Sequence, residues 1–299
     1  MIRIGPAGFD YKDWAGIVYP KPRPRGFDPL ADLARYFDTI EINSTFYRPM
    51  RADVVRSWAD RVGGNERFRF AMKLWRRFTH ERDTAFDAAE VKQARAGLEA
   101  MLDEQRLGAV LVQFPWSFRN DDKNNEWLHD VLSAFDGLPL VVEVRHASWN
   151  TRDFYAALVE RGVGIVNIDQ PLFKNSIRPS AKATSAVGYV RVHGRAYRDW
   201  FRKQATRDER YDYLYSAEEL KPWVERTREI ADNPRVEDTF VVTNNHHAGK
   251  APVNALMMQA MIDDEKVAAP PLLYAAYPDA LSRYAHPGFT AKEDSEARL

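Results

Sequence analysis

Several short runs of this chain alternate between apolar and polar residues, so that each run has one apolar and one charged face. In residues 39–43 the two isoleucines fall on one side, and Glu41 and Asn43 fall on the other. Because side chains alternate along a β-strand, this spacing predicts a strand whose apolar face packs under helices. The same alternation recurs in residues 67–73, 140–145 and 189–193. We expect the charged faces to meet inside a closed barrel.

The order of the predicted elements is typical of a single (β/α)8 TIM-type barrel with parallel strands and outer helices. The predicted strands are 2–8, 39–43, 67–73, 109–114, 140–145, 163–169, 188–193 and 239–244. Apolar residues at helical spacing predict helices that begin near Asp28 and cover 52–62, 89–102, 126–135, 151–161, 216–230 and 252–262. Asp28 before Pro29 is a helix start, and Ser216 with Glu219 is a capping box.

One interval departs from the alternation of strand and helix. Residues 170–187 contain Pro171 and Pro179 among small polar residues and predict no regular sixth helix. Neither a shift in composition nor a linker divides the chain, so we expect one barrel domain over residues 1–289. Residues 290–299 are expected to form a disordered tail.

The composition of the 299 residues narrows the classes of function. Lys plus Arg and Asp plus Glu each number 43, so no bulk charge draws the chain to nucleic acid or to an anionic membrane. Cysteine is absent, which excludes disulfides, thiolate nucleophiles and cysteine-ligated metal centres. Neither a signal-peptide pattern nor an apolar run that could cross a bilayer is present. We expect a cytoplasmic protein without a membrane partner, and the sequence does not indicate its oligomeric state.

The carboxyl ends of the predicted strands carry the residues that could perform chemistry, and these ends form the active site of a TIM barrel. Glu41 and Glu143 are the candidate acid/base carboxylates, and His193 is the candidate proton shuttle. The candidate substrate-binding residues are Asn43, Tyr47, Lys73, Gln113, Arg145, His146, Arg191, Asn244, Asn245 and His246. Under the alternative interpretation, the charged residues form an ion-pair lattice that only fills the barrel.

Motifs along the chain resemble, in order, those of the YecE-like family, also called domain of unknown function 72. They are GFDYKDW (8–14) with Tyr19-Pro20, EINSTFY (41–47), FTH (78–80), QFP (113–115), EVRH (143–146) with Trp149, YVRVHG (189–194), and NNH (244–246) with Gly249, Ala251-Pro252 and Asn254-Ala255. One departure is Phe9-Asp10 before Tyr11, where the family more usually carries Gly-Trp-x-Tyr. The resemblance covers roughly residues 1–262 and implies a TIM barrel. The family has no settled reaction, so the resemblance implies the fold rather than the function.

The first constellation at the strand ends predicts an anion site. Lys73, Arg145 and Arg191 lie on inward faces, and further arginines follow in the adjoining loops. The loop after the last strand contains Gly249 before a helix that opens with Pro252, and helix N-termini attract phosphate. We therefore expect a phosphate or carboxylate at this mouth, and we expect the loss of Arg191 to weaken anion binding more than stability.

The second constellation could hold a metal ion. Glu41, Glu143, His193 and His246 from several strand ends suit manganese, zinc or magnesium in a hydrolase or isomerase. Against this, Arg145 and Arg191 share the same faces and would repel a cation. We predict a site without a metal or another cofactor.

The third constellation is a set of aromatic residues in the loops, which could stack on sugars or bases. Its strongest members are Tyr47, Trp75 and Trp116, and residues 195–215, rich in arginine and aromatics, could form a lid. These features favour a second hypothesis, a barrel without turnover that binds nucleotides or single-stranded nucleic acid. The favoured hypothesis is an enzyme, of a hydrolase, lyase or isomerase class left open, that acts on a small anion by metal-independent acid/base chemistry.

Overall fold

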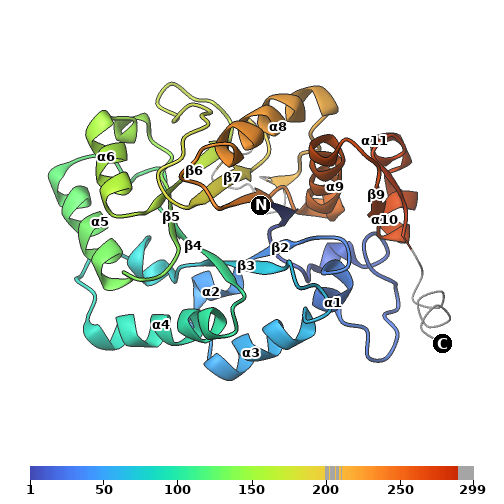
Figure 1. The fold of residues 1–299 in the computed structure, drawn as a ribbon, viewed down its shortest axis with the longest axis horizontal. Helices are drawn as coiled ribbons and strands as arrows, with labels where there is room; N and C mark the ends of the chain where they lie inside the picture. The colour runs from blue at the N-terminus through green and yellow to red at the C-terminus, as the bar shows by residue number, and fades with distance from the viewer. Residues whose placement is uncertain (199–201, 203–205, 207–208, 210, 289–299) are drawn as a thin grey trace.

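The computed structural model describes residues 1–198, 202, 206, 209 and 211–288. Its centre is a sheet of eight parallel strands: β1 (Ile2–Pro6), β2 (Thr39–Ile42), β3 (Arg69–Lys73), β4 (Leu107–Gln113), β5 (Leu140–Glu143), β6 (Gly164–Asp169), β7 (Val187–Val192) and β8 (Asp238–Thr243). Helices surround the sheet on its outside (Figure 1). Each strand overlaps one that was predicted from the sequence, so the expected (β/α)8 barrel is confirmed.

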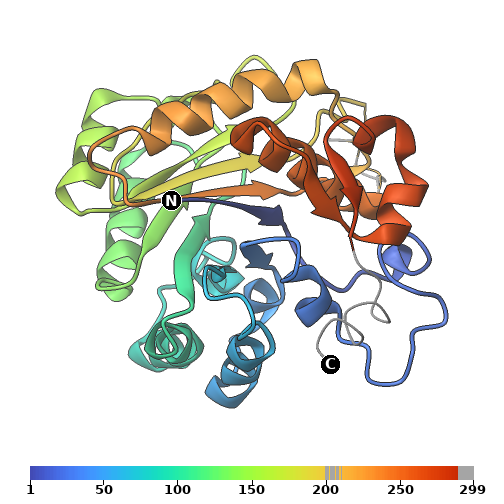
Figure 2. The same cartoon turned by 45° about the vertical axis from the view of Figure 1, so that its right-hand side comes forward.

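The barrel is closed by β1, which pairs fully with β8 on one side and only briefly with β2 on the other. β1 pairs with β8 from Ile2 opposite Thr239 to Pro6 opposite Thr243, and Figure 2 shows these two strands side by side, with α8 (Ala217–Ala231) and α9 (Lys250–Asp263) outside the sheet. β1 and β2 share only a bridge from Ala7 to Glu41, where the Gly8 N–H donates to the Glu41 carbonyl at 2.8 Å. This short junction completes the ring of strands.

The outer helices follow the predicted helical spacing, with shifts of a few residues at their ends. The others that cover the sheet or its loops are α1 (Pro29–Leu33), α2 (Ser44–Tyr47), α3 (Ala52–Arg61), α4 (Ala88–Asp103), α5 (Asp122–Ala134) and α6 (Arg152–Glu160). Asp28 caps α1 through its side chain, and Ser216 with Glu219 forms the capping box of α8. The described residues between β6 and β7 form no helix, which confirms the irregular sixth unit.

A small C-terminal unit follows the barrel and was not predicted from the sequence. It consists of β9 (Val267–Ala269), α10 (Pro271–Ala276), α11 (Pro278–Leu281) and β10 (Ala285–Pro287), and its two strands pair in parallel. The tail expected at residues 290–299 lies outside the described residues. Across the described part of the chain, no helix is both long and apolar enough to span a membrane.

The strand parity separates an apolar outer layer from a charged interior. Ile40 and Ile42 on β2 are 0% and 1% exposed within the hydrophobic core, and Glu41 between them is 0% exposed as well. Because neighbouring side chains on a strand point in opposite directions, Glu41 faces the barrel interior. The charged faces therefore meet beneath the carboxyl end of the barrel.

Candidate functional site

A buried ion-pair cluster lies inside the barrel beneath its carboxyl end. Arg191 on β7 donates from Nε to Glu41 Oε2 at 2.8 Å and from Nη2 to Glu41 Oε1 at 2.5 Å. Its Nη1 donates to Glu143 Oε2 at 2.8 Å. The side chain of Arg191 is 2% exposed and both carboxylates are 0% exposed. One guanidinium therefore joins β2 to β5 through two carboxylates, and its bidentate contact with Glu41 is of the strong kind.

Both carboxylates also have further partners. Arg145 Nε donates to Glu143 Oε1 at 2.9 Å, and His193 Nε2 lies 3.2 Å from the same oxygen. Asn244 Nδ2 lies 3.0 Å from His193 Nδ1, an arrangement that leaves the proton of the neutral ring on Nε2, toward Glu143. The Tyr189 hydroxyl donates to Glu41 at 3.0 Å. The cluster thus satisfies its buried charges internally.

The electrostatics of the cluster fix which of its members are charged. Burial raises the pKa of Glu143, but the positive charges around it, Arg191 first, hold that pKa well below the ordinary value. Burial lowers the pKa of His193 to about 3, against the opposing pull of Glu143. At neutral pH the carboxylate and the guanidinium are therefore charged, and the imidazole is neutral.

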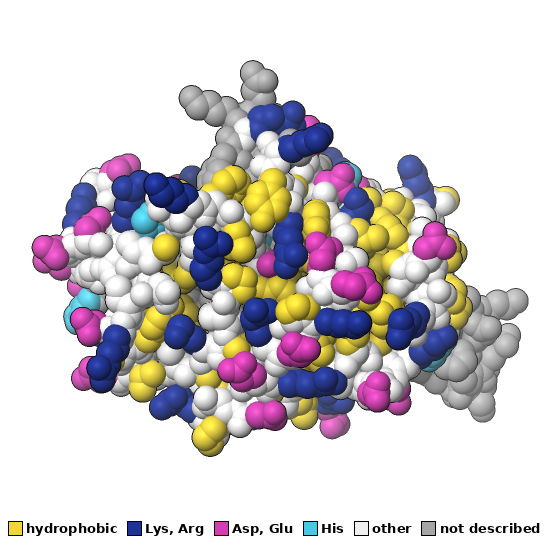
Figure 3. Space-filling model, turned by 90° about the horizontal axis from the view of Figure 1, so that it is seen from above, with side chains coloured by type: hydrophobic (Ala, Val, Ile, Leu, Met, Phe, Trp, Pro, Cys, Tyr) yellow, Lys and Arg dark blue, Asp and Glu magenta, His cyan; other side chains and the backbone are white. Residues whose placement is uncertain are grey.

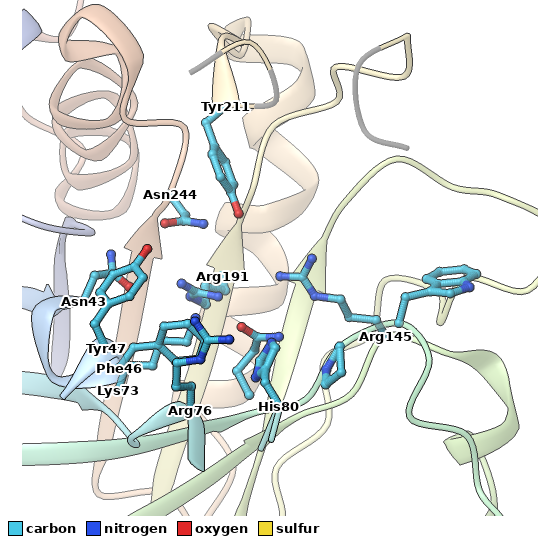
Figure 4. A pocket seen from close by; sticks show the side chains of 13 residues that line it. Asn43, Phe46, Tyr47, Lys73, Arg76, His80, Arg145, Arg191, Tyr211 and Asn244 are labelled. Atoms are coloured by element: carbon cyan, nitrogen blue, oxygen red, sulfur yellow. The ribbon is translucent and has the colours of Figure 1, made fainter. Parts of the chain in front are cut away.

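A cleft of about 450 Å³ opens directly above this cluster. Its lining residues are Asn43, Phe46, Tyr47, Lys73, Arg76, His80, Gln113, Pro115, Trp116, Arg145, Arg191, Tyr211 and Asn244. Figure 4 shows side chains from several strand ends pointing toward this common space, with Tyr211 above it. The described lining contains Lys and Arg side chains but no Asp or Glu, so the cleft is positively charged where a ligand would enter.

Lys73 reaches the cleft from the end of β3. The Thr45 hydroxyl donates to its backbone carbonyl at 2.6 Å, which anchors the strand end. Its Nζ lies 4.0 Å from the centroid of the Phe46 ring, and no carboxylate of the described residues pairs with it. Burial, followed by the charge of Arg191, lowers the pKa of Lys73 to about 7. The amine therefore titrates near neutral pH.

Sequence reasoning gave no role in the site to His80 or Tyr211, and it counted Arg76 only among the loop arginines. His80 Nδ1 lies 2.9 Å from the Thr79 hydroxyl, and its ring meets Phe46 edge-on with centroids 4.9 Å apart. Burial, followed by the charge of Lys73, lowers the pKa of His80 to about 3. The FTH motif that contains His80 could have indicated this position, whereas no strand pattern in the sequence leads to Tyr211.

The structure brings most of the predicted site residues together. Those that line the cleft are Asn43, Tyr47, Lys73, Gln113, Arg145, Arg191 and Asn244. Glu41, Glu143 and His193 lie in the cluster beneath it and do not line it. The expected convergence of the charged strand faces is confirmed, whereas the catalytic roles of these three residues stay predictions.

Three predicted binding residues pack beside the cleft instead of lining it. The His246 ring stacks on Tyr11 with centroids 4.4 Å apart and planes 5° apart. Asn245 Nδ2 donates to Asn254 Oδ1 at 2.8 Å, and His146 Nδ1 lies 2.9 Å from the Ser148 hydroxyl. Their contacts hold the loops after β5 and β8 in place.

The loop after β8, where we expected a phosphate, carries an internal anion. The Ala248 N–H donates to Asp13 Oδ2 at 2.6 Å, and Lys250 pairs with Asp212. A carboxylate of the protein therefore satisfies the donor that precedes α9. The cationic groups open to a ligand lie instead across the barrel mouth.

Among the described residues, the candidate metal ligands are not gathered into one group. Within the described ranges, no group of three or more His, Asp or Glu side chains is arranged to hold a metal ion. Arg191 bridges Glu41 and Glu143 and occupies the position between them that a shared ion would need. His246, the fourth ligand of the metal hypothesis, stacks outside this cluster.

The segment after β7 is tied to the barrel by its described residues. Arg195 Nε donates to Asp169 Oδ2 at 2.9 Å, and the Tyr215 hydroxyl donates to the same oxygen at 2.5 Å. Burial, followed by the charge of Asp169, raises the pKa of Tyr215 well above its ordinary value. Much of the lid expected over residues 195–215 falls outside the described residues.

Comparisons with known proteins find relatives along most of the chain. The model of a family described as "Protein of unknown function DUF72" matches residues 3–276. The UPF0759 protein YunF of Bacillus subtilis (strain 168) is 27% identical over 278 residues, which cover 89% of this chain and 96% of that protein. The UPF0759 protein YecE of Escherichia coli O157:H7 is 24% identical over 204 residues, which cover 68% of this chain and 67% of that protein.

A solved structure has the same fold over most of its length. The DUF72 family protein TM1631 of Thermotoga maritima MSB8 is 33% identical, with a TM-score of 0.75, and the match covers 88% of this chain and 99% of that one. The DUF72 family protein EF0366 of Enterococcus faecalis V583, at 24% identity and a TM-score of 0.75, covers 88% of this chain and 96% of its own. The latter likeness concerns the fold alone.

Proposed function

This chain belongs to the DUF72 family, and from that premise we propose that it is an enzyme acting on a small anionic substrate in the cleft above the ion-pair cluster. The reaction proceeds by acid/base chemistry that needs no metal. A cleft of about 450 Å³ suits a small molecule, since ligand sites commonly span roughly 300–1,000 Å³.

The observation that carries the proposal is the charge of the cleft wall. Lys73, Arg76 and Arg145 line it together with Arg191, whereas the balancing carboxylates Glu41 and Glu143 lie beneath. A set of cations held at a partly desolvated wall attracts an anion more strongly than the same charges spread over a surface. Phosphate or carboxylate oxygens are the groups that this wall fits.

The role proposed for each residue depends on whether its side chain lines the cleft. Lys73, Arg76 and Arg145 contact the anion, because they line the cleft. Glu41 and Glu143 orient Arg191 and keep it charged. A general acid or base must approach the reacting proton to about 3 Å, directly or through one water. For Glu41, Glu143 and His193, that approach requires Arg191 or Asn244 to move aside.

The second candidate function is nucleotide or single-strand binding without turnover. Phe46, Tyr47, Trp116 and Tyr211 line the cleft and could stack on a base. Against it, basic and acidic side chains intermingle over the face seen in Figure 3, and the chain has a formal net charge of zero. An extended phosphate backbone finds no continuous basic track on that face.

Thermal denaturation in the presence of single ligands tests the proposal. We expect inorganic phosphate, sugar phosphates or small carboxylates to raise the melting temperature of the wild type. The rise should be strongly reduced in Arg76→Gln and retained in Lys123→Gln, a change of an exposed residue on α5. Ligands that stabilise the protein are then incubated with it, and turnover is followed by NMR.

Two results would count against the enzyme. If none of the anions changed the melting temperature, the proposed anion site would be contradicted. Binding of a single-stranded oligonucleotide that weakens steeply with salt, without any effect of small anions, would favour the second candidate.

A further inference from the structure

Lys73 differs from the other cations of the cleft in its partners. Arg145 and Arg191 donate to Glu143, and Arg76 Nε lies 2.7 Å from Glu81 Oε1. The ammonium of Lys73 has no carboxylate partner among the described residues, and its Nζ lies over the Phe46 ring at 4.0 Å from the centroid. A desolvated amine beside another cation is the setting in which a lysine becomes a nucleophile.

We propose that Lys73 is the nucleophile of this cleft and forms a Schiff base with a small anion that carries an aldehyde or ketone group. The inference rests on the proposed function, because the neighbouring arginines hold the phosphate or carboxylate of that substrate. It narrows the substrate from any small anion to a carbonyl-bearing one.

The surroundings of Lys73 supply the two conditions that activate an amine. Its side chain is partly buried against Phe46, and the guanidinium of Arg191 lies in the same cleft. Burial and the charge of Arg191 favour the uncharged amine, Glu41 and Glu143 oppose them, and the net effect lowers the pKa of Lys73 to about 7. A substantial fraction of the amine is therefore free at neutral pH, unlike that of an ordinary exposed lysine.

The covalent step balances without an oxidant or a reductant. The lone pair of Nζ attacks the carbonyl carbon, the carbonyl oxygen takes up two protons and leaves as water, and a carbon–nitrogen double bond remains. The protonated imine draws electrons from the adjacent carbon, so removal of a proton there or cleavage of the next carbon–carbon bond becomes easier. Hydrolysis of the imine returns Lys73. This chemistry favours a lyase or an isomerase over a hydrolase.

Pyridoxal 5′-phosphate is a suitable probe, because it joins an aldehyde to a phosphate. The full-length protein is incubated with it, reduced with borohydride to fix any imine, and digested for mass spectrometry. We expect Lys73 to be labelled on the order of 10-fold or more faster than the exposed Lys123 at neutral pH, because more of its amine is free. The rate at Lys73 should level off above pH 7, where its amine is fully uncharged.

Inorganic phosphate and two variants complete the test. Phosphate should slow labelling of Lys73 and leave that of Lys123 unchanged. Lys73→Arg should lose the label at this position, and Arg76→Gln should lose the protection by phosphate.

The outcomes separate this inference from the function on which it rests. Labelling of Lys73 at the rate of Lys123, in a protein that phosphate still stabilises against heat, would overturn the Schiff base and leave the anion site in place. Rapid labelling that phosphate does not slow would overturn the inference as well, since it requires capture of the anion. If Lys73 were not labelled and phosphate did not stabilise the protein against heat, the proposed function would be contradicted as well.

Discussion

At the scale of single residues, Arg191 decides the character of the site. Its three nitrogens donate to Glu41 and Glu143, so the residue is a buried partner of two carboxylates as well as part of the cleft wall. Removing one member of such a cluster leaves uncompensated charge in the interior. From this arrangement we expect the loss of Arg191 to lower stability markedly, whereas the sequence alone predicted a larger effect on anion binding than on stability.

We predict that Arg191→Met lowers the free energy of unfolding by about 3–5 kcal/mol, because Glu41 and Glu143 lose their main partner. Urea denaturation measures the change. The control is Arg23→Met, which removes a half-exposed ion pair with Asp10 and should change the free energy by no more than about 1 kcal/mol. Equal midpoints for Arg191→Met and the wild type would contradict the prediction.

His193 gives a second prediction, on the pH dependence of stability. Its pKa is lowered from 6.5 to about 3 in the folded protein, so the unfolded chain binds the proton first as the pH falls. As the pH falls from 6.5 toward about 3, the free energy of unfolding therefore decreases, and His193 contributes up to ~1.4 kcal/mol per pH unit to this decrease. We expect His193→Gln to reduce the slope of the unfolding free energy against pH by the amount that corresponds to about one bound proton.

Urea titrations between pH 7 and pH 4 check this expectation, with His129→Gln on the exposed face of α5 as the control. His80 also has a lowered pKa. Because it is present in both variants, its contribution to the slope of stability against pH is the same in both. An unchanged slope in His193→Gln would show that the ring is already protonated, or solvated, in the folded state.

At the scale of elements, β1 approaches β2 closely at Gly5. A Cβ atom on Gly5 would lie 1.8 Å from the Thr39 carbonyl oxygen, far inside any real contact. Only glycine lets the two strands approach closely enough for the bridge between Ala7 and Glu41. Glu41 of this bridge also accepts hydrogen bonds from Arg191, so the spacing of β1 and β2 bears on the geometry of the cluster.

We predict that Gly5→Ala destabilises the protein by about 1–3 kcal/mol, because the added methyl group forces β1 away from β2. Gly64→Ala is the matched control, since a Cβ there meets nothing within 4 Å. Chemical denaturation of both variants measures the effect. Similar unfolding free energies for the two would mean that the barrel relaxes at this junction without loss.

At the scale of the whole molecule, the barrel converts distant parts of the chain into one electrostatic unit. Glu41 and Arg191 lie 150 residues apart in the sequence, and Arg191 and Glu143 lie 48 apart. The carboxylates of Glu41 and Glu143 lie beneath the cleft, and the lysine and arginine side chains line it. A protein with a formal net charge of zero therefore presents a positive cleft. The bulk composition gave no sign of this separation.

The sequence by itself determined the eight strands, most of the outer helices and the inward position of the charged residues. These follow from local periodicity, because a strand that is apolar on one face must bury that face. It also indicated the absence of a sixth helix, through Pro171 and Pro179.

Only the tertiary structure decided which inward residues reach a ligand. Strand parity places Glu41, Lys73 and Arg191 on the same interior, but their depth depends on the register between strands, which no local pattern encodes. Which charges pair also depends on distance in space. Arg191 lies between two carboxylates, whereas Lys73 packs on Phe46 and pairs with no carboxylate of the described residues. The sequence therefore specified the set of charged groups, and the closure of the barrel assigned them to a buried cluster or to an open cleft.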